Sequence, residues 1–159
     1  MKALVAAARL MRYAAMVALL LMMAVTILDV GMRIAINELV LGSVEVVQLA
    51  LVATVFLALP ETFLHDQHIT VDALDQFASP RAVRSARIVA GIAASVLVGV
   101  MAWRMVLPAI DTLVYGDLTN DLQMSLFWYW LPMLIGILLA AVITVYLAWR
   151  RFKSPSGDI

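Results

Sequence analysis

Four long stretches without a charged residue constrain this chain more than any other feature of its sequence. They are residues 13–28, 46–60, 88–103 and 124–149. A helix that crosses a bilayer needs about 20 mostly apolar residues, so the three shorter stretches must extend into flanks that carry charge. We therefore predict an all-α integral membrane protein with four transmembrane helices in a single domain, residues 1–159. The approximate spans are 13–33, 44–63, 86–107 and 125–149.

Composition supports a membrane protein and excludes several kinds of chemistry. Hydrophobic residues make up 65% of the chain and charged residues 14%, which leaves too little polar surface for a water-soluble domain. The chain has no cysteine, so it can form no disulfide, thiolate nucleophile or iron–sulfur cluster. The formal net charge is zero, and nothing in the sequence suggests a nucleic-acid partner.

The distribution of basic residues predicts the orientation of the helices. Three segments carry three basic residues each: Lys2, Arg9 and Arg12; Arg81, Arg84 and Arg87; Arg150, Arg151 and Lys153. The opposite side has only Arg33 and Arg104, and the segment 108–123 carries three aspartates and no basic residue. Because basic segments stay in the cytoplasm, we predict a multi-pass protein of the bacterial inner membrane with both termini inside (N-in, C-in). The first helix is expected to be a retained anchor.

The segment between the second and third spans, residues 64–85, is predicted to be a cytoplasmic loop with structure of its own. Val71, Leu74 and Phe77 have helical spacing, which predicts a short amphipathic helix on the inner leaflet. Ser79 and Pro80 are typical of a helix N-cap and first turn. The tail 153–159 is expected to be disordered.

Two further prolines lie in or beside the spans. Pro108 is expected to end the third helix, and Pro132 falls within the fourth. Small residues recur at every fourth position in three of the spans, a spacing that permits close helix packing in lipid. The ridges are Ala50, Thr54 and Ala58; Gly91, Ser95 and Gly99; Gly136, Ala140 and Thr144. Chance spacing in alanine-rich helices is the alternative, and the two glycine-containing ridges are favoured as packing surfaces.

Charged residues are expected near the ends of the spans, Arg104 included, which leaves the middle of the membrane without a site for substrate or coupling ion. Asp29 and Arg33 are i,i+4 neighbours, and Glu45 could also reach Arg33. For these residues, intramolecular ion pairs that fix the loops are favoured over docking to another membrane chain. The same two interpretations apply to Glu61. His65 and His68 are too weak a pattern to predict a metal site.

Several polar residues at defined positions carry a resemblance to a known family. They are Arg33 and Asn37 after the first helix, Glu45 at the start of the second, the segment His68, Ile69, Thr70, Val71 and Asp72, and Pro132 with Gly136 in the fourth helix. With these residues, the chain from 12 to 152 resembles the small membrane subunit, the DctQ-like component, of tripartite ATP-independent periplasmic (TRAP) transporters.

The resemblance implies an accessory role in secondary active transport. The expected partners are a large elevator-type membrane subunit, to which sodium ions are assigned, and a periplasmic solute-binding protein. The small subunit itself is expected to hold no catalytic group, cofactor, metal or substrate, and the solute would be an organic acid or similar small molecule. The candidate structural or subunit-interface residues are Arg33, Glu45, His68, Asp72, Gly91, Gly99, Pro132 and Gly136.

Three other functions are weighed against this one. The small subunit of a tripartite tricarboxylate transporter also has four helices, but the His68 to Asp72 segment favours a TRAP transporter. A self-sufficient homodimeric exporter would need a carboxylate in the middle of the membrane, whereas Glu45 and Glu61 lie at span ends. A membrane enzyme is disfavoured because no nucleophile, acid–base pair or ligand set converges.

Overall fold

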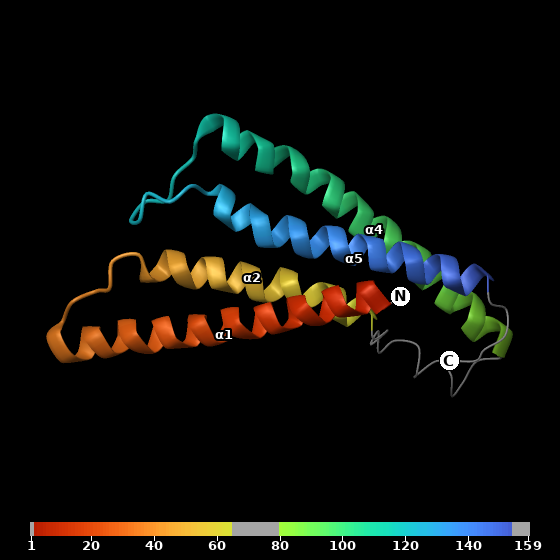
Figure 1. Cartoon of the computed structure of the whole chain (residues 1–159), viewed down its shortest axis with the longest axis horizontal. Helices are drawn as coiled ribbons and strands as arrows, with labels where there is room; N and C mark the ends of the chain where they lie inside the picture. Colours follow the sequence, from red (N-terminus) through yellow and green to blue (C-terminus); the bar gives the residue numbers. More distant parts are fainter. Residues whose placement is uncertain (1, 65–79, 154–159) are drawn as a thin grey trace.

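Four helices make up the described part of the chain, residues 2–64 and 80–153 of a computed structural model. They are α1 (Lys2–Ile36), α2 (Ser43–Leu64), α4 (Pro80–Tyr115) and α5 (Phe127–Lys153). The helices lie side by side in the order α1–α2–α5–α4, with α1 and α4 at the two edges (Figure 1). The start of α1 and the end of α5 lie at the same end of this layer (Figure 1).

Contacts between helices follow this order closely. α1 packs on α2, α2 packs on α5, and α5 packs on α4, whereas α1 touches α5 only marginally. Among the described residues, α4 meets neither α1 nor α2. The fold is therefore two helical hairpins, α1–α2 and α4–α5, that join along a single seam between α2 and α5.

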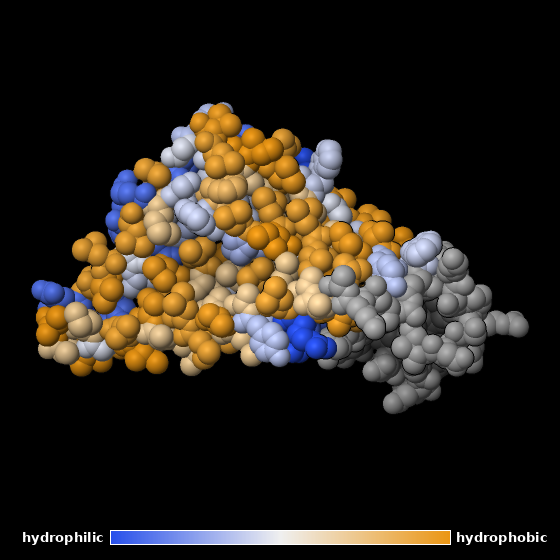
Figure 2. Space-filling model, in the orientation of Figure 1, coloured by the Kyte–Doolittle hydropathy of each residue, from blue (hydrophilic) through white to orange (hydrophobic). Residues whose placement is uncertain are grey.

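Most of the apolar surface faces outward, as expected for helices in lipid. All four helices are long and apolar enough to cross a membrane, which confirms that part of the fold prediction. The chain buries only 6% of the apolar span of α1 and 11% of that of α4, against 22% and 28% for α2 and α5. Figure 2 shows apolar residues over most of the face in view, with hydrophilic residues gathered toward its ends.

Residues with a left-handed backbone end both edge helices. Asn37 (φ 54°) follows α1 and donates its N–H to the Arg33 carbonyl at 3.1 Å; Gly116 (φ 67°) follows α4 and donates to the Thr112 carbonyl, also at 3.1 Å. This is the αL cap that commonly terminates helices, formed by glycine or asparagine because they tolerate positive φ.

The expectation that Pro108 ends the third helix is wrong. α4 runs through Pro108 to Tyr115 and stops at Gly116. A proline removes one backbone hydrogen bond, but breaking the helix in an apolar segment would leave several backbone groups without partners in lipid, which costs far more. The other two proline predictions are confirmed, because α4 begins at Pro80 and Pro132 lies inside α5.

The small-residue ridges differ in what they pack against. Gly136, Ala140 and Thr144 are all buried, and a Cβ at Gly136 would overlap the backbone carbonyl of Phe56 on α2. The α2 ridge faces α1, since the Thr54 hydroxyl approaches the Ala15 carbonyl at 3.5 Å. A Cβ at Gly99, by contrast, would meet nothing within 4 Å. The Gly136 ridge is therefore the seam between the two hairpins.

Some predictions fall on residues that the structure does not describe. These are the amphipathic helix around residues 69–77, the residues His68 and Asp72, and the tail 154–159. They stay predictions.

Candidate functional site

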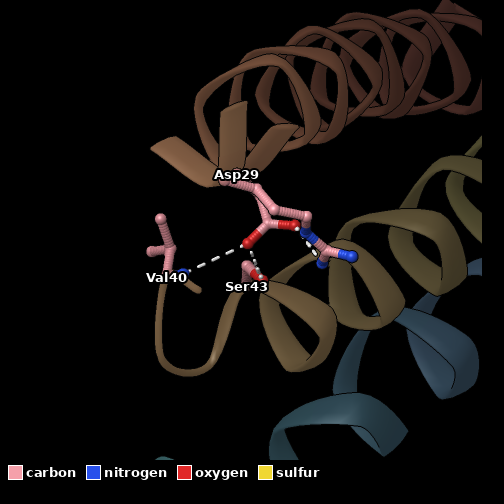
Figure 3. Close-up of polar contacts among 4 residues, drawn as sticks. Asp29, Val40 and Ser43 are labelled. Carbon is pink, nitrogen blue, oxygen red and sulfur yellow. Dashed lines mark hydrogen bonds and ion pairs between the residues drawn. The ribbon is translucent and has the colours of Figure 1, made fainter. Parts of the chain in front are cut away.

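The loop between α1 and α2 is closed by one carboxylate. Asp29 lies on α1 and accepts hydrogen bonds from the Val40 N–H at 3.2 Å and from the Ser43 hydroxyl at 3.0 Å (Figure 3). Arg33, one turn further along α1, lies 3.2 Å from the other carboxylate oxygen of Asp29. The predicted i,i+4 contact of Asp29 with Arg33 is confirmed. Its structural consequence is that the start of α2 is fixed to the side of α1.

A second carboxylate joins the two hairpins at the same end of the layer. Glu45 is 7% exposed, and its two carboxylate oxygens accept the backbone N–H groups of Asp121 (2.7 Å) and Leu122 (3.0 Å) in the α4–α5 connection. The proposed contact of Glu45 with Arg33 is therefore wrong. Glu45 points toward the α4–α5 connection. Two backbone N–H groups there satisfy the hydrogen-bonding capacity of a buried carboxylate better than an arginine that is 58% exposed would.

Tyr129 completes this arrangement, which we call the loop-end cluster (Asp29, Ser43, Glu45, Tyr129 and the amides of Asp121 and Leu122). The Tyr129 hydroxyl on α5 donates to the Glu45 backbone carbonyl at 2.8 Å. Gly42 lies against the Leu122 side chain with φ 76°, so both its conformation and its lack of a Cβ are required there. The cluster therefore binds both connecting loops through backbone groups.

Substitution of Asp29 tests whether it acts as a cap or as an ion-pair partner. Asp29→Ala is expected to lower the free energy of unfolding in detergent by about 1–2 kcal/mol, because two donors at the start of α2 lose their acceptor. Arg33→Ala should cost less than about 0.5 kcal/mol, since its exposed pair is weak. Equal losses for the two variants in a denaturant titration would show that the ion pair, not the cap, stabilises this loop.

A second ion pair lies near the opposite end of the layer. Arg12 on α1 and Glu61 on α2 are 2.9 Å apart, with side chains 42% and 13% exposed. The Arg12 guanidinium also lies 5.1 Å from the ring centroid of Tyr13. These residues line an open cavity of about 220 Å³ together with Val5, Arg9 and Leu64. For Glu61, the structure supports the reading of an intramolecular pair that fixes α1 to α2.

A double-mutant cycle measures this pair. Arg12→Gln and Glu61→Gln are each expected to destabilise the chain, with a coupling energy of about 1 kcal/mol in the cycle. Arg9→Gln is the matched control, because Arg9 lines the same cavity but has no acidic partner among the described residues. Additive losses at Arg12 and Glu61, or an equal loss at Arg9, would contradict a specific pair.

Arg104 lies beside the residues of α4 that pack on the middle of α5, and not at an end of α4. Its neighbours Ala102 and Met105 pack in the core cluster with Ile137 and Ala140, which are in the middle of the apolar span Phe127–Trp149 of α5. An arginine at the centre of a spanning helix costs about 2.5–3.5 kcal/mol on insertion. Because α4 continues through Pro108 to Tyr115, eleven residues of helix follow Arg104.

Comparison with protein families decides which group the chain belongs to. A family model described as "Tripartite ATP-independent periplasmic transporters, DctQ component" matches residues 22–154. The chain belongs to the DctQ family. Searches among curated proteins and among solved structures find no match. DctQ membership confirms the resemblance seen in the sequence, and it favours a transporter component over a membrane enzyme.

The structure brings together some of the residues on which the DctQ resemblance rests. Arg33 and Glu45 lie in or beside the loop-end cluster, and Gly136 lies at the seam. Pro132 is in α5, while Gly91 and Gly99 lie on α4, away from the seam. Among residues 2–64 and 80–153, no group of three His, Asp or Glu side chains is placed to bind a metal.

Sequence reasoning missed the partners of these residues. Tyr129 and the amides of Asp121 and Leu122 were not singled out, and neither was Thr112, whose hydroxyl accepts the Trp130 indole N–H at 2.9 Å. Gly42 directly before Ser43 was the available signal, because glycine is the usual residue where the backbone takes a positive φ or another segment approaches closely. No local signal identifies the amides, since every residue except proline carries one.

Proposed function

We propose that this DctQ-family chain is the static accessory subunit of a TRAP transporter, with both termini in the cytoplasm of a bacterium and its four helices in the inner membrane. It would assemble with a large elevator-type membrane subunit that carries solute and sodium ions. A periplasmic solute-binding protein would deliver an organic acid or similar small solute to that pair. The family match over residues 22–154 carries the proposal.

The geometry supports a static structural role in two ways. Carboxylates fix both loops at one end of the layer by accepting backbone N–H groups, and the Arg12–Glu61 pair fixes the other end of α1–α2. The two edge helices bury little of their apolar surface within the chain, which leaves a wide surface for lipid and for a larger membrane protein. A rigid unit with open edges is suited to extend an immobile scaffold.

The proposed orientation places the loop-end cluster on the periplasmic side. The α1–α2 and α4–α5 connections lie at the end of the layer opposite to the start of α1 (Figure 1), so an N-in chain would present them to the solute-binding protein. The surface around Leu39 and Leu41, which are 68% and 81% exposed, and around Leu122 would then be available for docking. His68 and Asp72 would lie on the cytoplasmic side and support assembly.

Co-purification tests the proposal. The tagged chain, co-expressed with its genomic neighbours and extracted in mild detergent, is expected to retain one large membrane subunit that mass spectrometry identifies from its gene. Reconstituted uptake should then require that subunit, the binding protein and this chain together. Retention of only further copies of this chain, with flux by the purified chain alone, would instead establish a small exporter.

A further inference from the structure

Arg104 is an exposed cation within the apolar stretch Ile88–Tyr115 of α4, where the other charged residue is Asp111. The face of α4 that contacts α5 is defined by its buried residues, which are Val98, Ala102, Ala109 and Thr112, with Met105 also packed on the core cluster. Their spacing of three and four residues marks one stripe of the helix. Arg104 lies off this stripe, is exposed, and forms no ion pair or hydrogen bond among the described residues.

The exposed residues of α4 outside this stripe include two neighbouring sets at helical spacing that differ in charge. The first, the Arg104 flank, consists of Leu97, Met101, Arg104, Pro108, Asp111 and Tyr115. The second, the apolar flank, consists of Val96, Val100, Trp103, Leu107, Ile110 and Val114. Only the first carries charge. A surface made wholly of apolar side chains suits lipid, whereas charged residues in spanning helices generally face protein or water.

The position of Arg104 along α4 separates it from the loop end of the α4–α5 pair. Near that end, Thr112 accepts the indole N–H of Trp130, which lies in the first turn of α5. Arg104 precedes Thr112 by eight residues, which is about 12 Å along the helix axis. Helical side chains lean toward the N-terminus of their helix, so Arg104 leans away from the level of Trp130. The guanidinium is therefore directed away from the loop end of the pair.

We infer that the Arg104 flank of α4 is the surface on which the large membrane subunit docks, through a spanning helix that carries an acidic side chain at the depth of Arg104. This inference rests on the proposed function, and it adds which face of which helix forms the interface. A carboxylate beside Arg104 would compensate a charge that this chain leaves without a partner among its described residues.

Repulsion between like charges argues against a second copy of this chain as the occupant. Two copies inserted the same way around a two-fold axis would bring Arg104 against Arg104, and like charges in the membrane repel. Asp111 cannot serve as the acid across such an interface, because it lies seven residues, about 10 Å, further along the axis. The occupant therefore differs from this chain.

Cross-linking tests the position of the interface. The chain has no cysteine, so single cysteines can be placed at Leu97 and Val96, which are consecutive, 61% and 60% exposed, and on the two different flanks. In membranes that co-express the neighbouring genes, a benzophenone–maleimide on Leu97→Cys is expected to cross-link to the large subunit at least 10-fold more than on Val96→Cys. Equal yields, or an adduct only with a second copy, would overturn the inference.

Charge variants test the role of Arg104 itself. Arg104→Glu is expected to reduce the amount of large subunit retained in a pull-down at least 10-fold. The amount of this chain in the membrane should equal that of the unchanged protein. Arg104→Lys should retain most of the large subunit that the unchanged protein retains. Unchanged retention by Arg104→Glu would overturn the inference while leaving the proposed function intact. An unchanged chain that retains no large subunit would overturn the proposed function, and this inference with it.

Discussion

Gly136→Ala is expected to produce the largest loss of stability of any single methyl group added to this chain, about 3 kcal/mol or more in the free energy of unfolding. The new Cβ would overlap the Phe56 carbonyl, which is backbone and cannot rotate away as a side chain could. α2 and α5 must therefore separate, and the seam between the hairpins loses its packing. Thermal unfolding of the purified chain in mild detergent measures the loss.

Gly99→Ala is the matched control. Gly99 also lies inside a membrane helix, but a Cβ there meets nothing within 4 Å, so this variant should be neutral or more stable by up to about 1 kcal/mol through better helix propensity. Comparable losses for the two variants would show that glycine matters for backbone flexibility in these helices. In that case the close approach of α2 to α5 would not be the cause.

The second large effect is expected at Glu45. Glu45→Ala removes the acceptor of the Asp121 and Leu122 N–H groups, and each hydrogen bond to a charged group contributes about 1.5–3 kcal/mol. We expect a loss of about 3 kcal/mol in the free energy of unfolding and faster proteolysis within the α4–α5 connection. Limited proteolysis of inverted or right-side-out vesicles, with mass spectrometry of the fragments, measures the second effect.

Two controls separate the backbone contact from simple charge effects. Glu45→Gln keeps one acceptor oxygen and should lose about half as much stability. Asp121→Asn should change stability by less than about 0.5 kcal/mol, because Glu45 binds the Asp121 backbone and not its side chain. A gain of stability in Asp121→Asn comparable to the loss in Glu45→Ala would mean that repulsion between carboxylates dominates this site.

The sequence predicts the helices well because each is specified locally. Stretches without charge identify all four, and Pro80 marks the start of α4 from its own chemistry. The end of α4 could not be predicted by the same reasoning. The rule that proline breaks helices holds for segments whose backbone can bond to water, and Pro108 lies in an apolar segment where it cannot.

The site could be predicted only in part, because its contacts join distant segments. The Asp29–Arg33 pair is local to one helix and follows from i,i+4 spacing. The partners of Glu45 lie 76 and 77 residues away and are backbone groups, which no side-chain pattern reveals. The level of Arg104 relative to α5 depends on how the two helices are aligned, and that alignment is set by packing of Ala102 and Met105 on Ile137 and Ala140.

The division into two hairpins has a consequence for biogenesis. Within each hairpin the helices are neighbours in the sequence, so their contacts can form as soon as the second helix of each pair leaves the translocon. The α2–α5 seam cannot form until residues beyond Gly136 have been synthesised. Until then the first hairpin lies in the bilayer with the side of α2 that will meet α5 still uncovered. That face is the part of the nascent chain most open to capture by other membrane helices or to membrane proteases.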